Sequence, residues 1–364
     1  MKLKFKETPE QVELIKAMGS KKPEVAREAS EAFADYISPV IQQVLMQADT
    51  ASSIYTDVVY DEDDNPSYPL DLFYEQRNSD NYVTVWSQNM AGGLPSSQVS
   101  GTQELKISTY RLDSAVSILK KYARKGRLDV VSKLVERMGQ EILVKQERNA
   151  WAVLLKALAE GKGTAGSAGD HIVDSTGSTG PFTVDSLNQL ITKMKRLNKS
   201  FAGGTPASTY SEGVTDLFVS PEVKQDIRAM AYQPLNPGAS GENIPDDAKS
   251  VAWKSAGIPT LFGINIIDLQ ELGVGQKYNK LFENFEGGSF ADASSHEVLI
   301  GVDSSKEALI RPVARNADTG STFTAIPDDQ YTQRQDKAGF YGSIEEGRAC
   351  IDARALAGIT VKRS

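Results

Sequence analysis

The sequence contains few of the residues that build covalent or metal chemistry. Among 364 residues there is one cysteine, Cys350, and there are two histidines, His171 and His296. A single thiol excludes an intrachain disulfide and every zinc or iron–sulfur site that needs several cysteines. Both histidines lie among loop-forming residues, so we expect both imidazoles at the surface. No Ser/His/Asp or Cys/His arrangement can be assembled from the sequence. We interpret Cys350, between Ala349 and Ile351, as a small buried apolar residue.

Long apolar runs and clustered basic residues are also missing. No stretch approaches the ~18 uninterrupted apolar residues of a membrane span, and Met1–Lys6 lacks the apolar core of a secretory signal. We therefore expect a soluble cytoplasmic product without a membrane partner. The net charge is −8, the pI is near 5.1, and no uninterrupted basic run exceeds two or three residues. This balance argues against a protein that binds nucleic-acid phosphates by itself.

Three short motifs suggest chemistry but lack the context that it requires. Gly161-Lys-Gly-Thr-Ala-Gly166 matches the dinucleotide fingerprint, which needs a strand before it and a helix after it. Here a helical segment precedes the motif, and a stretch rich in Gly, Ser and Thr continues to Gly180, which predicts a flexible loop. Asp61–Asp64 lacks the ligand spacing of a calcium loop and is interpreted as a solvated, charged turn. Ser117–Lys120 fits S-x-x-K without companion motifs. We therefore predict no catalytic residue, no metal, no cofactor and no enzymatic activity.

The longest periodic segment runs from Arg127 to Glu160. It contains no proline, and Gly161 follows as a natural helix stop. Its apolar residues recur mostly three or four positions apart, which predicts a helix that buries one stripe. At 1.5 Å per residue the helix would reach roughly 50 Å. The stripe drifts from a strict heptad and Gly139 interrupts it, which favours a strut across an extended subunit over a coiled coil. We expect four of its residues to face a sheet: Leu134, Met138, Ile142 and Trp151.

Residues 1–55 are expected to form a helical arm. Thr8-Pro9-Glu10-Gln11 is a capping box with proline at the first helical position, and a second helix starts after Pro23. Ser38-Pro39 is expected to break or recap that second helix. The apolar stripes are narrow for the length of these helices. We therefore expect the arm to pack on something other than itself.

Residues 56–112 have the character of a long β-hairpin. Strands are expected at Tyr68–Phe73, Asn81–Trp86 and Leu105–Leu112, with turn-rich segments between them. Aromatic and other large apolar side chains concentrate in this segment. A hairpin of this size cannot bury them by itself, so we expect it to lie on a partner.

The second half of the chain mixes helices and strands without βαβ order, which predicts an α+β sheet. Helices are expected from Phe182 and after Ser220-Pro221, and short strands at Asp216–Val219 and Leu261–Leu269. Further strands are expected towards the C-terminus, at Val298–Gly301, Ala308–Pro312, Gly339–Ile344, Arg348–Ile351 and Ile359–Lys362.

The order of these elements resembles the major capsid protein of tailed bacteriophages, which has the Hong Kong 97 type fold. Leu217-Phe-Val-Ser-Pro-Glu222 resembles the strand-to-helix step of its axial (A) domain, and Pro259–Ile264 resembles the short strand after an A-domain loop. Gly342–Leu356 resembles the strands that rejoin the peripheral (P) domain. The resemblance implies an α+β capsid fold with five parts: an N-arm (1–55), an extended E-loop hairpin (56–112), a first P-domain part with a spine helix (113–180, helix 127–160), a mainly A-domain part (181–296), and P-domain return strands with the C-terminus (297–364).

The resemblance also implies a function and partners. The protein would self-assemble into hexamers and pentamers of an icosahedral shell that encloses double-stranded DNA without sequence-specific binding. Its partners would be other copies, a portal and a separate scaffolding protein, because the chain starts at Met1 within the arm-like helices. A decoration protein stays open, and the location would be the virion capsid after assembly in the host cytoplasm. Intersubunit contacts would come from the E-loop (Tyr82, Val83, Trp86, Met90, Leu94 and Lys106) and from the N-arm (Phe33, Tyr36 and Ile37).

Two alternatives and one covalent feature are left open by the sequence. Bacterial nanocompartment shells, the encapsulins, share this fold and enclose cargo enzymes. A soluble α+β hydrolase with a carboxylate pair leaves no local signature in a sequence. Particle size separates shell from enzyme, and the particle's contents separate capsid from nanocompartment. Some family members cross-link their shells by a Lys–Asn isopeptide bond, for which Lys106 is the sole E-loop candidate between Asp57 and Leu119.

Overall fold

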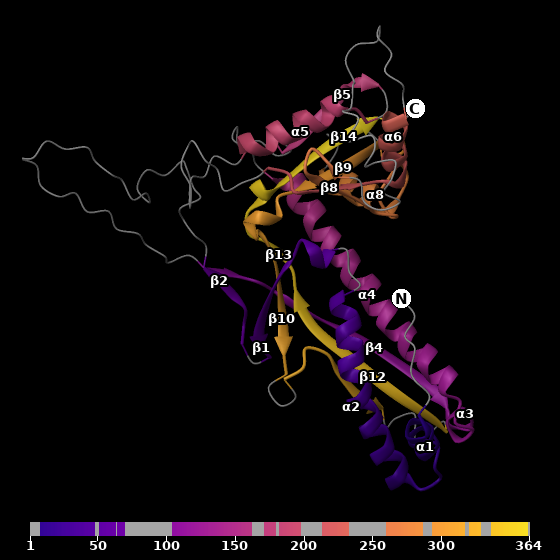
Figure 1. The fold of residues 1–364 in the computed structure, drawn as a ribbon. Coiled ribbons are helices and arrows are strands. Elements are labelled where there is room, and N and C mark those ends of the chain that lie inside the picture. The colour runs from indigo at the N-terminus through magenta and orange to yellow at the C-terminus, as the bar shows by residue number, and fades with distance from the viewer. Residues whose placement is uncertain are drawn as a thin grey trace, which may run out of the picture. The chain divides into compact units, whose positions relative to one another are not determined.

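The computed structural model describes residues 8–47, 51–62, 64–69, 104–161, 171–179, 182–197, 213–232, 260–286, 293–316, 320–328 and 336–362. The chain divides into two compact units (Figure 1). Unit 1 comprises Met1–Tyr68, Lys106–Ala150 and Leu309–Ala349. Unit 2 comprises Pro69–Leu105, Trp151–Ala308 and Cys350–Ser364.

Unit 1 is built on a six-stranded sheet in which β12 (Lys337–Gly347) is central. On one side β12 pairs antiparallel with β4 (Thr109–Leu119) along its whole length, from Lys337 opposite Leu119 to Gly347 opposite Thr109. On the other side it pairs with β11 (Thr324–Asp328) and, near its end, with β10 (Leu309–Arg315). Strand β1 (Thr56–Asp61) runs parallel to β10 and ends the strand order, and the short β13 (Ala349–Cys350) also pairs with β10.

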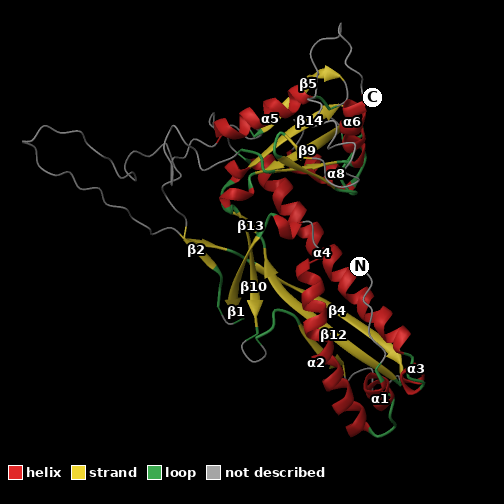
Figure 2. Ribbon diagram, viewed as in Figure 1, coloured by secondary structure: helices red, strands yellow, loops and turns green. Residues whose placement is uncertain are grey.

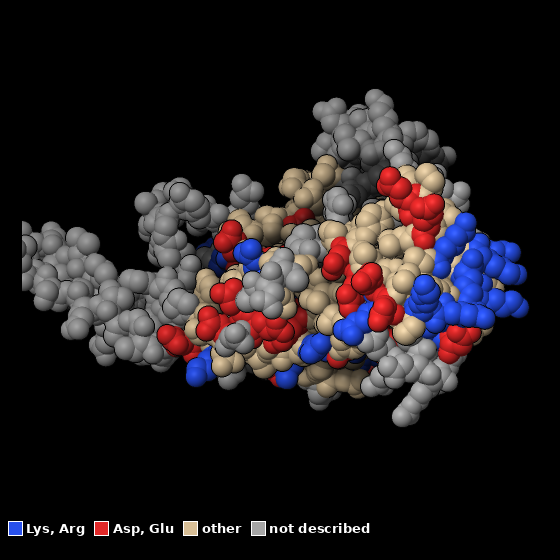
Figure 3. Space-filling model, turned by 90° about the horizontal axis from the view of Figure 1, so that it is seen from below, with Lys and Arg blue, Asp and Glu red and all other residues tan. Residues whose placement is uncertain are grey.

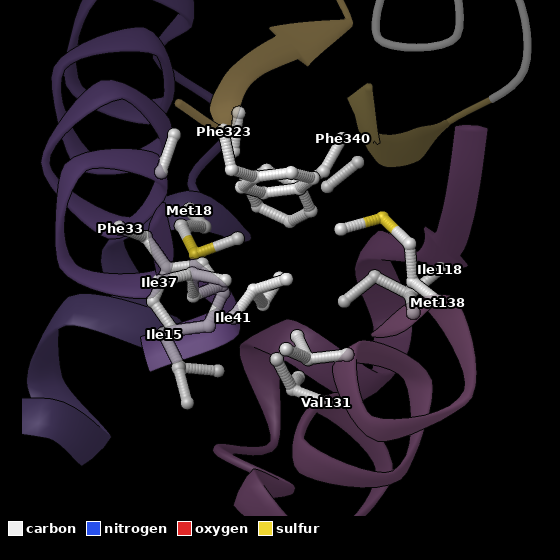
Figure 4. Close-up of a cluster of buried hydrophobic side chains, with 14 of the residues drawn as sticks. Ile15, Met18, Phe33, Ile37, Ile41, Ile118, Val131, Met138, Phe323 and Phe340 are labelled. Atoms are coloured by element: carbon white, nitrogen blue, oxygen red, sulfur yellow. The ribbon is translucent and has the colours of Figure 1, made fainter. Parts of the chain in front are cut away.

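The two faces of this sheet differ because side chains alternate along a strand. Phe340, Gly342 and Ile344 of β12 stand opposite Val116, Ser114 and Leu112 of β4 on the inner face. Helices α1 (Pro9–Met18), α2 (Pro23–Gln47) and α3 (Lys120–Arg124) and the first part of α4 (Leu128–Glu160) pack on that face (Figures 2 and 4). The outer face is polar, and Arg111 there binds Asp113 at 2.9 Å and stacks over the Tyr341 ring.

Helix α4 is one continuous element, as the apolar spacing predicted. Met138, Ile142 and Gln146 lie four residues apart on its buried face. A Cβ on Gly342 would come within 3.1 Å of the Met138 side chain, which places this face of α4 on β12. Gly139 lies within the helix without interrupting it. The predicted contact with a sheet is therefore confirmed.

The helical arm corrects two expectations. Helix α2 continues through Pro39 instead of breaking there. A proline removes the hydrogen bond to the carbonyl four residues earlier, here that of Asp35, which lies on the exposed side of the helix where water can bind it. The arm packs on other elements, as expected, but these belong to its own subunit: Phe33 and Ile37, predicted as contacts with a neighbour, are 4% and 2% exposed and lie in the unit 1 core (Figure 4). The narrow apolar stripe suffices because α1, α2, α4 and the sheet share one core.

Unit 2 is a second six-stranded sheet with helices on both faces. Its strand order is β5 (Ile172–Thr179), β14 (Leu356–Lys362), β9 (His296–Val302), β6 (Asp216–Val219), β8 (Ile264–Asp268) and β7 (Thr260–Leu261). Leu217 and Val219 join the apolar cluster of α5 (Val184–Leu197) and α6 (Pro221–Tyr232). Phe218 points to the other face, where its ring packs edge-on to Trp151 of α4 at 4.7 Å, and Tyr278 of α8 (Lys277–Glu286) joins them.

The second unit departs from the sequence prediction in three places. The predicted loop up to Gly180 contains β5, which pairs parallel with β14. Strands β9 and β14 belong to the sheet of unit 2 rather than returning to unit 1, because β9 lies between β14 and β6 with every residue buried. Helix α8 was not predicted at all. The described residues also include three short 3₁₀ turns, at Ala51–Ser53, Ser304–Lys306 and Ala353–Ala355.

Candidate functional site

The two ends of the predicted hairpin belong to the described part of the chain. Strand β2 (Ser67–Pro69) pairs with β3 (Glu104–Lys106), and the Ile107 amide donates to the Pro66 carbonyl at 3.1 Å. Lys106 is exposed. The other predicted E-loop contacts lie outside the described residues, so their contact with a neighbour stays a prediction: Tyr82, Val83, Trp86, Met90 and Leu94.

A buried carboxylate holds the strand that leaves this hairpin. Glu346 of β12 is fully buried and accepts hydrogen bonds from Arg311 Nε at 2.8 Å, Gln146 Nε2 at 3.0 Å and the Tyr110 hydroxyl at 3.0 Å. These donors come from β10, α4 and β4. Burial, together with the nearby charge of Glu346, raises the pKa of Tyr110 to about 12, so the phenol remains a donor at physiological pH.

Arg348 adds a second cation to this cluster. Its Nε lies 3.6 Å from Glu346 Oε1, and its guanidinium stacks over the Tyr55 ring at 4.8 Å. The Tyr55 hydroxyl in turn donates to the Ala150 carbonyl at 2.9 Å. Buried charges are stable when they are paired and hydrogen-bonded, and the Glu346 carboxylate meets both conditions.

The neighbouring glutamate holds the strand that enters the hairpin. Glu345 points to the opposite face of β12 and accepts hydrogen bonds from the Thr109 hydroxyl at 2.8 Å and the Tyr60 hydroxyl at 3.2 Å. Burial raises the pKa of Tyr60 to about 12. Tyr60 lies on β1, before the hairpin, and Tyr110 lies on β4, after it. Two successive glutamates therefore clamp both strands at the hairpin base, which is a structural arrangement rather than a reactive one.

Two exposed surfaces of unit 1 carry charges of opposite sign. The β1 surface consists of Val58 and Val59, 40% and 56% exposed, with the exposed acids Asp61, Glu62 and Asp64 beside them. The α3 surface consists of Leu119 and Tyr122, 45% and 42% exposed, with the exposed bases Lys121, Lys125 and Arg127. Figure 3 shows Lys and Arg side chains gathered densely at the end of the molecule where α1 and α3 lie.

The α3 surface is a feature that the sequence reasoning missed. Five of the eight residues from Lys120 to Arg127 are basic, and no acidic residue interrupts them. The signal was present in the sequence, but a search for uninterrupted runs overlooks basic residues that are spaced by Tyr122, Ala123 and Gly126. The expectation that basic residues do not cluster is therefore wrong for this segment. The segment Asp61–Asp64 lies at the surface as predicted for a charged turn, with Asp61, Glu62 and Asp64 exposed.

The three predicted contact residues of the helical arm differ in exposure. Tyr36 is 40% exposed and its hydroxyl accepts from Gln11 Nε2 at 2.9 Å, so it is the predicted arm residue that a neighbour could reach. Phe33 and Ile37 are instead core residues of their own subunit.

Both histidines are buried, which corrects the surface assignment. His171 Nδ1 lies 2.8 Å from the Leu356 carbonyl next to β5, and His296 belongs to β9. Cys350 is half-buried. Among the described residues, no group of three or more His, Cys, Asp and Glu could hold a metal ion. Within the same residues, no helix combines the length and apolarity of a membrane span.

Comparison with known proteins places the fold. No protein-family model and no curated protein matches the sequence. Among solved structures, the chain is similar to the capsid of cyanophage Pam1, with 12% identity, a TM-score of 0.51, and coverage of 85% of this chain and 88% of that one. The capsid of cyanophage P-SCSP1u (13% identity, TM-score 0.49, 85% and 87% covered) and the SrpI encapsulin of Synechococcus elongatus (12%, 0.39, 71% and 74%) are also similar. The Pam1 match confirms the predicted α+β fold of the Hong Kong 97 type.

Proposed function

We propose that this protein is the subunit of a closed icosahedral shell, the major capsid protein of a tailed phage. The observation that carries the proposal is the fold match to the Pam1 capsid, which extends over 85% of this chain and therefore includes residues of both units. Copies would form hexamers and pentamers, and the shell would enclose double-stranded DNA. The function is mechanical, and we propose no enzymatic activity.

Features of unit 1 support an assembly role. Glu345 and Glu346 hold β1 and β4, the strands that precede and follow the predicted hairpin, so such a hairpin would start from strands that are fixed in place. Aromatic residues concentrate in the hairpin sequence, as expected for a segment that is buried against a neighbour. The exposed apolar residues of the β1 and α3 surfaces offer further area for contact between copies.

The acidic balance of the chain suits a container more than a DNA-condensing protein. A net charge of −8 gives the wall little attraction for phosphate, so DNA would have to be driven in through a portal. We place a separate scaffolding protein among the partners, with the virion as the final location and the host cytoplasm as the place of assembly.

The test is to purify the protein after expression alone and with a scaffolding protein, and to examine it by sedimentation velocity and electron microscopy. The proposal predicts closed megadalton particles. Nuclease-protected double-stranded DNA in particles from infected cells would support a capsid, whereas a protein cargo would indicate a nanocompartment. A chain that stays a monomer or small oligomer under all these conditions would contradict the proposal.

A further inference from the structure

The α3 surface carries positive charge that the described residues of its own subunit do not pair. Within the described part of the chain, Lys121, Lys125 and Arg127 form no ion pair. Arg124 instead fixes the short helix: its Nε donates to the Gly19 carbonyl at 2.6 Å and its Nη2 binds Asp336 at 3.2 Å. The surface is therefore held in place from below while its lysines point to solvent. Leu119 and Tyr122 add exposed apolar area at the same place.

The β1 surface is its counterpart in charge and in apolar content. Among the described residues, Asp61 and Asp64 form no ion pair, and Glu62 accepts only a weak hydrogen bond from Asn316 Nδ2 at 3.2 Å. Strand β1 ends the strand order of the sheet, so its outer edge has no partner strand among the described residues. Val58 and Val59 are exposed along that edge. An exposed edge strand with apolar side chains is a surface that proteins usually cover.

We propose that the α3 surface of one copy docks on the β1 surface of a second copy of this chain. The inference rests on the proposed shell function and names a contact within it. The contact would bring three bases to three acids, with exposed apolar side chains beside the charges on both surfaces. Because the two surfaces differ, the contact is head-to-tail, and such contacts propagate from copy to copy and close when the rotation allows it.

A second copy fits the α3 surface better than a polyanion does. A phosphate backbone would pair with the lysines but would leave Leu119 and Tyr122 exposed, since it offers no apolar surface. The chain as a whole carries 48 acidic and 40 basic residues, which opposes approach of a nucleic acid at low salt. Complementary charge at a rim steers association and suppresses wrong partners, and it is screened at high salt.

The experiment uses two charge-reversal variants of the full chain and their combination. The first is Lys121→Glu, Lys125→Glu and Arg127→Glu; the second is Asp61→Lys, Glu62→Lys and Asp64→Lys. The matched control reverses three exposed bases elsewhere in unit 1: Lys133→Glu, Arg137→Glu and Lys145→Glu. Circular dichroism checks that each variant folds, and sedimentation velocity with electron microscopy measures assembly across protein concentration at about 0.1 M and 1 M salt.

The proposal predicts that each reversal alone raises the protein concentration needed for assembly at least tenfold at low salt, with a smaller effect at 1 M salt. Combining both reversals should restore assembly, because the opposite charges meet again with their signs exchanged. The control should assemble like the wild type. Three results would overturn the docking while leaving the shell function intact: normal assembly of both single reversals, no rescue by the combination, or normal shells of the first variant that have lost only their DNA. A wild type that never assembles would contradict the shell function itself, and the docking with it.

Discussion

Replacing Glu346 by glutamine tests the clamp at the hairpin base. The change keeps the shape of the side chain but removes the charge that Arg311 and Gln146 bind in a fully buried position. It leaves the guanidinium of Arg311, whose side chain is 4% exposed, without its closest carboxylate. Removing one partner of a buried ion pair costs about 3–5 kcal/mol. For a domain of ordinary size this corresponds to a melting temperature lower by about 6–20 °C.

The matched control is Glu345→Gln on the same strand. Glu345 is half-buried and accepts hydrogen bonds from the hydroxyls of Thr109 and Tyr60, and an amide oxygen can still accept both of them. We therefore expect a cost of about 1 kcal/mol or less. The two variants differ by one position, so a difference between them reports on the buried cluster and not on the strand.

The assay is urea unfolding of unassembled subunits followed by far-ultraviolet circular dichroism. The two units need not unfold in a single transition. Amide hydrogen exchange in β4 and β12, which are paired strands of unit 1, therefore shows whether the affected unfolding transition is that of unit 1. We expect Glu346→Gln to lower both the unfolding midpoint of that transition and the protection of β4. If Glu346→Gln and Glu345→Gln agree to within about 1 kcal/mol, the clamp contributes little and the reasoning fails.

Three further perturbations test other parts of the structure. Gly139→Ala should stabilise the subunit by about 0.5–1 kcal/mol in urea unfolding, since the added Cβ meets no atom within 4 Å beyond its chain neighbours and its own helix backbone, and destabilisation would contradict a regular helix there. Burial raises the pKa of Cys350, Tyr60 and Tyr110 to about 12, above the 9.0 and 10.0 of the free groups, so the fold favours their protonated forms. Stability should therefore be full below about pH 9 and decline between about pH 9 and 12, and a flat profile in urea titrations would refute this. Replacing residues 75–103 by a short Gly-Ser turn should leave the circular dichroism normal but abolish closed shells, and normal particles from that variant would exclude the hairpin as an assembly element.

Elements with a strong local signal were predictable from the sequence. Helix α4 was found at Leu128–Glu160 because its apolar stripe is encoded at a period of three to four residues over many turns. Strands β9, β10 and β12 were found because short apolar runs in them mark buried strands. These signals depend on neighbours in the sequence alone.

Features that depend on distant partners were not predictable. The sequence around β5 is rich in Gly, Ser and Thr, which predicts a loop. The segment is a strand because β14, near the other end of the chain, pairs with it. Helix α2 passes through Pro39 because tertiary packing of Phe33 and Ile37 outweighs one missing hydrogen bond.

The residues of the candidate site illustrate the same limit. Gln146 and Glu346 lie 200 positions apart, and nothing in the sequence relates them. In retrospect one local clue existed, since Gln146 continues the buried row of Met138 and Ile142 with a polar side chain that needs a partner. The α3 surface was visible as five bases in eight residues, but its apolar neighbours and their exposure required the structure.

Cryo-electron microscopy of particles purified from cells that produce this chain tests the central claim most directly. The account predicts closed icosahedral shells whose subunits show both units of the fold, with the hairpin of each copy lying on a neighbouring copy. Homogeneous protein that is folded by circular dichroism but forms only monomers or small oligomers, even with a scaffolding protein present, would contradict it.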